Sequence, residues 1–265
     1  MVAASERLAE LLARPGTTLD RVMAVVASAA PHPPGEETVV SAFDELAIRL
    51  GAAPTGAKRL SSHQVVTYTY GKLGFIGDSA NYYHPDNSFI HRVLRRRRGI
   101  PLTLAAVAAE IGRRVDVELS IVGLPGHVIL GDGPEPFRWF DPFAGGAELD
   151  RQRCVQLFSR FHPVEAFDEA MLQPIGVEAV ATRMLTNLKL VYRRSGDLAQ
   201  LLKILDLSVA LPDSGPAERR ELAAMLAVTG RYDRAAEQHE ILATLDPDRA
   251  TEHLAAAARL RARRN

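Results

Sequence analysis

The sequence predicts a mostly helical α+β protein in three parts, with helices at both ends and a small antiparallel sheet between them. Two patterns lead to this prediction. Apolar residues recur every three or four positions along most of the chain, as in helices that bury one face. The clearest runs with the alternation of strands fall within residues 117–141. We place the three parts at residues 1–60, 61–172 and 173–265.

Composition indicates a folded protein without a charge bias. The 265 residues include 32 basic and 32 acidic side chains, and 47% are hydrophobic. Because these charges cancel, no global field attracts nucleic acid or an anionic membrane. The single cysteine, Cys154, excludes an internal disulfide framework and a cysteine-based zinc site. The chain shows no signal peptide and no run that could span a bilayer. We therefore expect a cytoplasmic protein with no nucleic-acid or membrane partner.

The first part is predicted to be helical at residues 5–12, 19–29 and 36–50, followed by a loop at 51–57. Apolar residues at the spacing i, i+3, i+4, i+7 give the second helix one buried face; they are Val22, Val25, Val26 and Ala29. Residues 62–73 are ambiguous, because VVTYTY favours a strand while its neighbours are helical.

Two consecutive helices begin the middle part. Asn87 or Ser88 suits the N-cap of a helix that ends in four arginines, Arg95 to Arg98. The arginines allow a nucleic-acid interpretation, but since the net charge is zero we interpret them as a solvated helix end. Pro101 suits the first turn of the next helix, which is almost wholly apolar over residues 102–111.

Strands are predicted at residues 117–123, 127–130 and 137–141. His127 begins the second strand and Asp141 ends the third, so a hairpin can bring their side chains together. Such a pair is either a base oriented by a carboxylate or a structural hydrogen bond. No third ligand lies at metal-site spacing, and no phosphate-loop or dinucleotide motif occurs, so we predict no metal and no cofactor.

A nucleophile for this pair is expected at a helix N-terminus, where the helix dipole lowers the pKa of a thiol. Within residues 99–104 the only nucleophilic side chain is Thr103, whose hydroxyl has a far higher pKa than a thiol. Cys154 shares a helical stripe with Leu157, Phe158 and Phe161, so we predict a buried, inert thiol.

The third part contains a repeat. RRSGDLAQLLKILDLSVALPD resembles AVTGRYDRAAEQHEILATLDPD, and Gly196 and Gly230 lie 34 residues apart (230 − 196). This is the tetratricopeptide period, with a helix, a glycine turn, a second helix and a proline stop at Pro212 or Pro247. Two units are too few for an independent solenoid, so we expect this part to pack against the rest of the chain or a partner.

Several of these segments resemble the SirB1 family, a branch of the transglutaminase-like superfamily; the matching runs are GFIGDSANYYHPDNS, NSFIHRVLRRRRGIPLTLAAVAAEIGRRV, LPGHVIL, FDPFAGG and RMLTNLKLVYRRSGD. The resemblance implies a transglutaminase-like (papain-like) core, a helix at residues 62–73 and a tetratricopeptide-like tail. His127 and Asp141 fall on the His and Asp of the transglutaminase triad. The cysteine position falls within residues 101–103, where this chain has no cysteine.

The absent thiol favours a non-catalytic protein that binds a protein or peptide and acts in regulation, as the SirB1 link to a transcription regulator in enteric bacteria implies. The alternative is a hydrolase or acyltransferase that uses Thr103 or a water activated by His127. The aromatic loop at residues 74–86 either forms a lip for the ligand or is pinned to the core. The predicted binding residues are Tyr83, Asn87, Arg98, Pro101, Pro125 and Gly126. The oligomeric state is left open.

Overall fold

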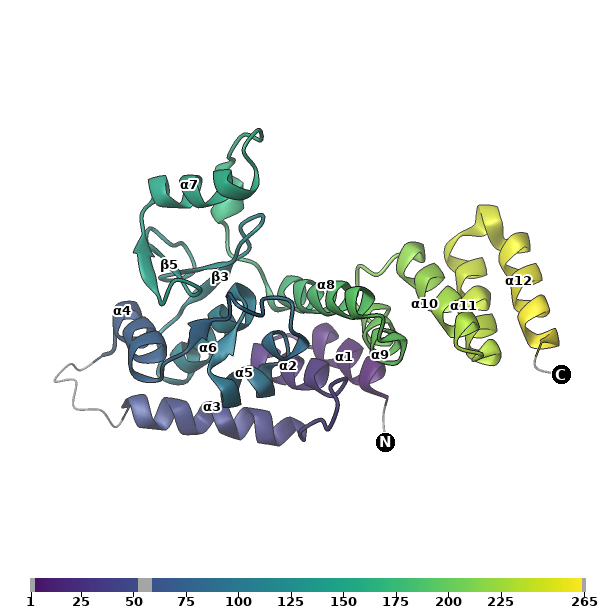
Figure 1. Cartoon of the computed structure of the whole chain (residues 1–265), viewed down its shortest axis with the longest axis horizontal. Helices are drawn as coiled ribbons and strands as arrows, with labels where there is room; N and C mark the ends of the chain where they lie inside the picture. Colours follow the sequence, from purple (N-terminus) through teal and green to yellow (C-terminus); the bar gives the residue numbers. More distant parts are fainter. Residues whose placement is uncertain (1–2, 52–58, 264–265) are drawn as a thin grey trace. The chain divides into compact units, whose positions relative to one another are not determined.

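The computed structural model describes residues 3–51 and 59–263 (Figure 1). Residues 16–184 form one compact unit, here the core unit, and residues up to 15 together with those from 185 onward form a second, the tail unit. Residues 16–51 therefore cluster with the sheet, whereas residues 3–15 cluster with the C-terminal helices. The three-part boundaries at residues 60 and 172 stay a prediction. Most of the loop predicted at residues 51–57 lies outside the described residues.

The core unit is built around α6 (Pro101–Arg114), a helix buried along almost its whole length. Four helices pack against it: α2 (Leu19–Ala27), α3 (Glu36–Gly51), α4 (Ser62–Val66) and α5 (Ile90–Arg96). The apolar run that predicted α6 explains this position, because only a helix surrounded by protein can be apolar on most sides.

Residues 62–73 are helical, as the family resemblance implied. The first turn is α4, and a π-helical turn over Thr67–Lys72 follows it. The amide of Leu73 donates to the carbonyl of Tyr68 at 2.8 Å. The wide turn directs Tyr70 inward, where its hydroxyl donates to the carbonyl of Leu104 in α6 at 3.1 Å.

An antiparallel sheet covers one end of α6, in the order β3 (Ser120–Val122), β4 (Ile129–Gly131), β5 (Trp139–Asp141) and β6 (Ala147–Leu149). Val122 pairs with Ile129, and Gly131 pairs with Trp139. The first three strands agree with the prediction. The fourth was missed because its side chains are largely exposed and give no alternating signal. On its other face the sheet packs on α7 (Arg151–Phe161) through an apolar cluster that includes Cys154 and Phe158.

A second, parallel pairing joins β1 (Ile76–Gly77) to β2 (Arg98–Gly99), immediately before α6. The short 3₁₀ helix η2 (Pro85–Asn87) lies between these strands in the chain. The helix α5 begins at Ile90 with Phe89 as its N-cap, so the prediction that Asn87 or Ser88 caps it is wrong. The Asn87 side chain bonds instead to the loop before it.

The tail unit contains α1 (Ala4–Ala13), α9 (Leu198–Ser208), α10 (Pro216–Val228), α11 (Tyr232–Leu245) and α12 (Ala250–Ala262). The helix α8 (Val177–Ser195) contributes residues to both units. Gly196 and Gly230 follow α8 and α10 with φ of 72° and 75°, a left-handed conformation that favours glycine. The predicted order of helix, glycine turn and helix is present, while the tetratricopeptide assignment stays a prediction. In the described ranges no helix has the length and apolarity needed to cross a bilayer.

Candidate functional site

His127 and Asp141 meet beside the hairpin of β4 and β5. His127 Nε2 lies 2.9 Å from Asp141 Oδ1, and both side chains are largely buried. Asp141 is the last residue of β5, and His127 lies two residues before β4. The structure therefore brings together the two residues that the hairpin register predicted to be neighbours.

The surroundings of Asp141 keep its carboxylate ionised. Burial alone would raise the pKa of Asp141, but hydrogen bonding and charge from His127 and two backbone amides outweigh it, so the pKa lies below its ordinary value. The amides are those of Phe143, at 2.9 Å, and Ala144, at 3.2 Å, and both donate to Oδ1. Because an ionised carboxylate only accepts, the Nε2 atom of His127 must carry the proton.

This arrangement leaves Nδ1 of His127 available. Among the residues that the structure describes, no hydrogen bond to Nδ1 is formed, and the atom is not among the fully buried unpaired ones. A neutral imidazole that donates through Nε2 accepts through Nδ1. In its neutral form His127 can therefore accept a hydrogen bond from a ligand or remove a proton from it.

Aromatic rings surround His127. Its ring stacks on Phe161 with centroids 6.1 Å apart, and it meets the edge of Phe143 at 6.4 Å. Phe143 contacts Tyr82, which contacts Tyr83. We call Tyr82, Tyr83, Phe143 and Phe161 the aromatic lip. Within the loop at residues 74–86, Phe75 is fully buried and pins the loop to the core, whereas Tyr83 is 52% exposed, as is Phe161 outside the loop. The loop therefore combines both predicted alternatives, and the role of the exposed rings as a ligand lip stays a prediction.

Two glycines leave room for the rings of Phe143 and Phe161 that lie next to His127. Gly126 has a φ of 77°, and a Cβ there would lie 2.6 Å from the Cβ of Phe161. Pro125 and Gly126 occupy the middle of a turn in which the His127 amide donates to the Leu124 carbonyl. A Cβ on Gly77 would lie 2.5 Å from Phe143. Both glycines are needed for close approach of an aromatic ring.

Thr103 has a different role from the one expected of a nucleophile. It is fully buried, and its hydroxyl donates to the Asn87 carbonyl at 2.7 Å while accepting from the Ile100 amide at 3.2 Å. Pro101 occupies the first position of α6, as predicted. The hydroxyl thus closes the N-terminus of α6, and this bonding argues against the catalytic role predicted for Thr103.

Cys154 is fully buried in the cluster between the sheet and α7. Burial, with smaller contributions from the charges of Asp150 and Asp141, raises the pKa of its thiol to about 12. The thiol is therefore protonated at neutral pH, in agreement with the predicted inert role.

A buried polar network fixes the loop that carries Tyr82 and Tyr83. Asn87 donates through Nδ2 to the carbonyl of Asn81 at 2.8 Å and accepts from Arg96 at 3.0 Å. Arg96 also pairs at 3.1 Å with Asp78, which is 2% exposed. The pattern of the sequence did not reveal Asp78 or Arg96, because they are 18 residues apart and belong to no periodic stripe.

Arg98 is the predicted binding residue that the structure separates from this arrangement. It lies on β2, its side chain is exposed, and within the described chain it contacts neither His127 nor Asp141. Sequence reasoning, in turn, missed Phe143 and Phe161 as neighbours of His127. The FDPFAGG motif and the end of the α7 stripe were the available signals, but neither indicates which ring His127 faces.

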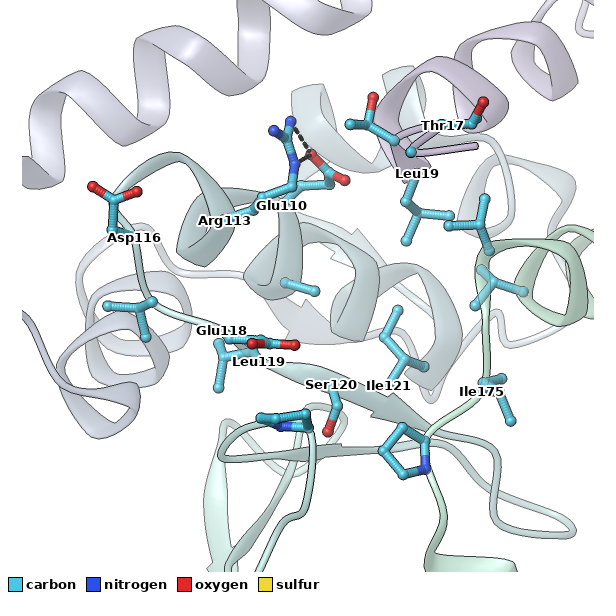
Figure 2. A pocket seen from close by; sticks show the side chains of 18 residues that line it. Thr17, Leu19, Glu110, Arg113, Asp116, Glu118, Leu119, Ser120, Ile121 and Ile175 are labelled. Atoms are coloured by element: carbon cyan, nitrogen blue, oxygen red, sulfur yellow. Dashed lines mark hydrogen bonds and ion pairs between the residues drawn. The ribbon is translucent and has the colours of Figure 1, made fainter. Parts of the chain in front are cut away.

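A separate cavity of about 690 Å³ opens where α6 leads into β3 (Figure 2). Leu19, Leu119, Ile121 and Ile175 line its apolar part, and the Glu110–Arg113 ion pair lies at its edge. None of the predicted site residues lines this cavity. Within residues 3–51 and 59–263, no three His, Cys, Asp or Glu side chains are grouped so as to hold a metal ion.

Comparison with known proteins places this arrangement in a wider context. A family model described as transglutaminase-like superfamily matches residues 17–186, nearly the residues of the core unit. A UPF0162 protein of Xylella fastidiosa is 32% identical over 162 residues, which are 58% of this chain and 57% of that protein. A UPF0162 protein of Pseudomonas aeruginosa is 29% identical over 185 residues, 69% of this chain and 68% of that protein. F-box only protein 21 of Homo sapiens is 31% identical over 157 residues, 54% of this chain and 24% of that protein. The match therefore spans little more than half the length of the Xylella relative.

Proposed function

Because the chain belongs to the transglutaminase-like superfamily, we propose that it uses the triad region of that fold to bind a peptide segment of a protein partner without cysteine chemistry. The observation that carries this proposal is the state of His127. Its ring lies between Phe161 and Phe143, and its Nε2 atom is hydrogen-bonded to Asp141. Its Nδ1 atom remains available for a hydrogen bond with a ligand. A regulatory role of the SirB1 type is part of the proposal.

The missing nucleophile supports binding over acyl transfer. The hydroxyl of Thr103 already donates and accepts within the protein. The thiol of Cys154 is buried, with a pKa of about 12. A covalent acyl intermediate needs an accessible, activated nucleophile. Neither residue meets that requirement.

The aromatic lip supports a peptide as the ligand. Exposed tyrosine and phenylalanine rings provide a large apolar contact area, and tyrosine hydroxyls add hydrogen bonds. The Nδ1 atom of His127 can accept from a peptide N–H or a side-chain hydroxyl. An extended segment with an apolar side chain over the lip satisfies both features.

Selection of peptides from a displayed library on the full chain tests the proposal. We expect binders whose affinity falls by about tenfold or more in Phe161→Ala, since truncating an interface aromatic typically costs over 1 kcal/mol. Phe137→Ala is the matched control, because Phe137 is 71% exposed but lies in the loop between β4 and β5, whereas Phe161 ends α7. A selection without binders, or equal losses in the two variants, would overturn the proposal.

The second candidate is a hydrolase in which His127 activates water. The ionised Asp141 at 2.9 Å favours it, because an oriented imidazole is a competent general base. Ester, amide and thioester substrates should then be turned over by the wild type and not by His127→Ala. Turnover lost on this substitution would replace the binding proposal with the enzymatic one.

A further inference from the structure

A smaller cavity of about 260 Å³ lies between α3 and α5, apart from His127 and the aromatic lip. The two helices lie side by side in the core unit (Figure 1). The cavity has an apolar wall from Val39, Leu46 and Leu94, while its basic residues are Arg49, Arg95 and Arg97. Arg49 and Arg95 are exposed and Arg97 is partly buried, so three positive side chains line one small cavity and favour an anionic ligand.

The three arginines lack that counterpart within the described chain. None of them forms an ion pair with a described residue, whereas their neighbours on α5 do. Arg92 pairs with Asp86 at 3.7 Å, and Arg96 pairs with Asp78 at 3.1 Å. The interpretation of Arg95 to Arg98 as a solvated helix end is therefore wrong for Arg96 and Arg97, whose side chains are partly buried.

Arg97 is the most constrained of the three. The face of its guanidinium lies over the buried ring of Phe75, with the central carbon 4.5 Å from the ring centroid. Its Nη1 atom is buried and has no hydrogen-bond partner. Burial and the charge of Arg49 lower the pKa of Arg97. A buried N–H without an acceptor is costly, so a rotation of the Arg97 side chain that brings Nη1 to a ligand oxygen would stabilise the folded protein.

His91 adds a second unpaired group to the same cavity. Both of its ring nitrogens are buried and lack a partner. Burial, together with the charges of Arg92 and Arg95, lowers the pKa of His91 to about 4, so the ring is neutral and can donate one hydrogen bond. Glu45 also lines the cavity, so the formal charge of the lining is +2, from three arginines and one carboxylate.

We propose that this cavity binds a phosphate monoester. A dianion balances the lining charge, and planar guanidinium groups match phosphate oxygens with two parallel hydrogen bonds. His91 and the Nη1 atom of Arg97 are unpaired and buried just behind the lining, and side-chain rotation on binding would turn these donors toward the ligand. The wall of Val39, Leu46 and Leu94 faces the organic group of the ester.

Titration calorimetry on the full chain at constant ionic strength tests this proposal, with phenyl phosphate, inorganic phosphate and succinate as probes. We expect 1:1 binding of phenyl phosphate that weakens by about tenfold or more in Arg49→Gln/Arg95→Gln, because the variant removes two positive charges and their hydrogen bonds to the ligand. Arg98→Gln/Arg231→Gln removes the same charge at exposed positions outside the cavity and should leave binding unchanged.

Absence of phenyl phosphate binding, an equal loss in the control variant, or equally tight succinate binding would each overturn the proposal. Thermal unfolding gives an independent readout. Because like charges repel without a ligand, Arg49→Gln should raise the unfolding midpoint of the unliganded protein and reduce the further rise caused by phenyl phosphate. An unliganded midpoint that stays constant or falls would contradict the unbalanced charge on which the proposal depends.

Discussion

The hydroxyl of Thr103 donates a hydrogen bond to the carbonyl of Asn87 across 2.7 Å. Thr103 belongs to the first turn of α6, and Asn87 ends the loop that carries Tyr82 and Tyr83. One buried contact thus joins the central helix of the core unit to the aromatic lip. The residue that the sequence offered as a nucleophile instead anchors the loop that carries Tyr82 and Tyr83.

Thr103→Val should destabilise the protein, because it leaves the Asn87 carbonyl and the Ile100 amide buried and unpaired. We expect the free energy of unfolding in urea to fall by about 2–6 kcal/mol, at roughly 1–3 kcal/mol for each of the two unsatisfied groups. Thr103→Ser keeps the hydroxyl and serves as the control, with a smaller loss. Equal losses in the two variants would show that the hydroxyl contributes nothing.

Arg96→Met should loosen the loop of residues 78–87. It removes the partner of the buried Asp78 carboxylate and one bond to Asn87, so we expect a loss of about 3–5 kcal/mol, as for other broken buried pairs. Hydrogen exchange of the loop amides should accelerate more than that of α6. Arg98→Met, at an exposed neighbour, should change neither measurement.

The pair of His127 and Asp141 should make the free energy of unfolding depend on pH in the acidic range. The folded pKa of Asp141 lies below its ordinary value of 3.8, so the unfolded chain takes up this proton at higher pH than the folded one. Its contribution is therefore present above about pH 4 and is lost as the pH falls through the folded pKa. At neutral pH, Asp141→Asn should be less stable by about 1–3 kcal/mol.

Urea unfolding of the wild type and Asp141→Asn over a pH series checks this expectation. The difference between the two proteins should narrow steadily below about pH 4, because the variant lacks the titrating group. A difference that stays constant in acid would show that the carboxylate charge does not matter to folding.

Cys154 should resist alkylation in the native protein. Its thiol is buried and its pKa is about 12, so iodoacetamide at neutral pH should react only as fast as the chain opens. Mass spectrometry with and without denaturant measures the two rates. Rapid modification of the folded protein would return Cys154 to the list of possible nucleophiles.

The helical framework could be predicted because its signal is local. The apolar run of residues 102–111 and the stripes around it report burial directly, and the runs at residues 117–123, 127–130 and 137–141 are short, apolar and bounded by turn residues. By contrast, the exposed strand β6 has no hydrophobic pattern that would predict it. The strands β1 and β2 have only two residues each, which is too short for a recognisable pattern. Pairings between distant short segments form only in the assembled fold. A local stretch of sequence therefore does not indicate which distant segment it will pair with.

The candidate site was predictable in part for the same reason. The His127–Asp141 contact follows from a hairpin, in which sequence separation and register determine which residues meet. Asp78, Arg96 and Phe161 approach the site from elements that are not neighbours in the sheet. Their roles depend on tertiary packing, and the side chain of Asn87 was assigned to a helix cap when it bonds to the preceding loop.

In the loop of residues 78–87, the side chains that fix the backbone differ from those that form its exposed surface. These inward side chains fix the loop backbone, while Tyr82 and Tyr83 project outward and are 38% and 52% exposed. Substitutions at the two tyrosines should therefore leave the polar network in place and change mainly the exposed surface of the loop. The outer residues of this loop can vary in sequence while its backbone conformation is retained.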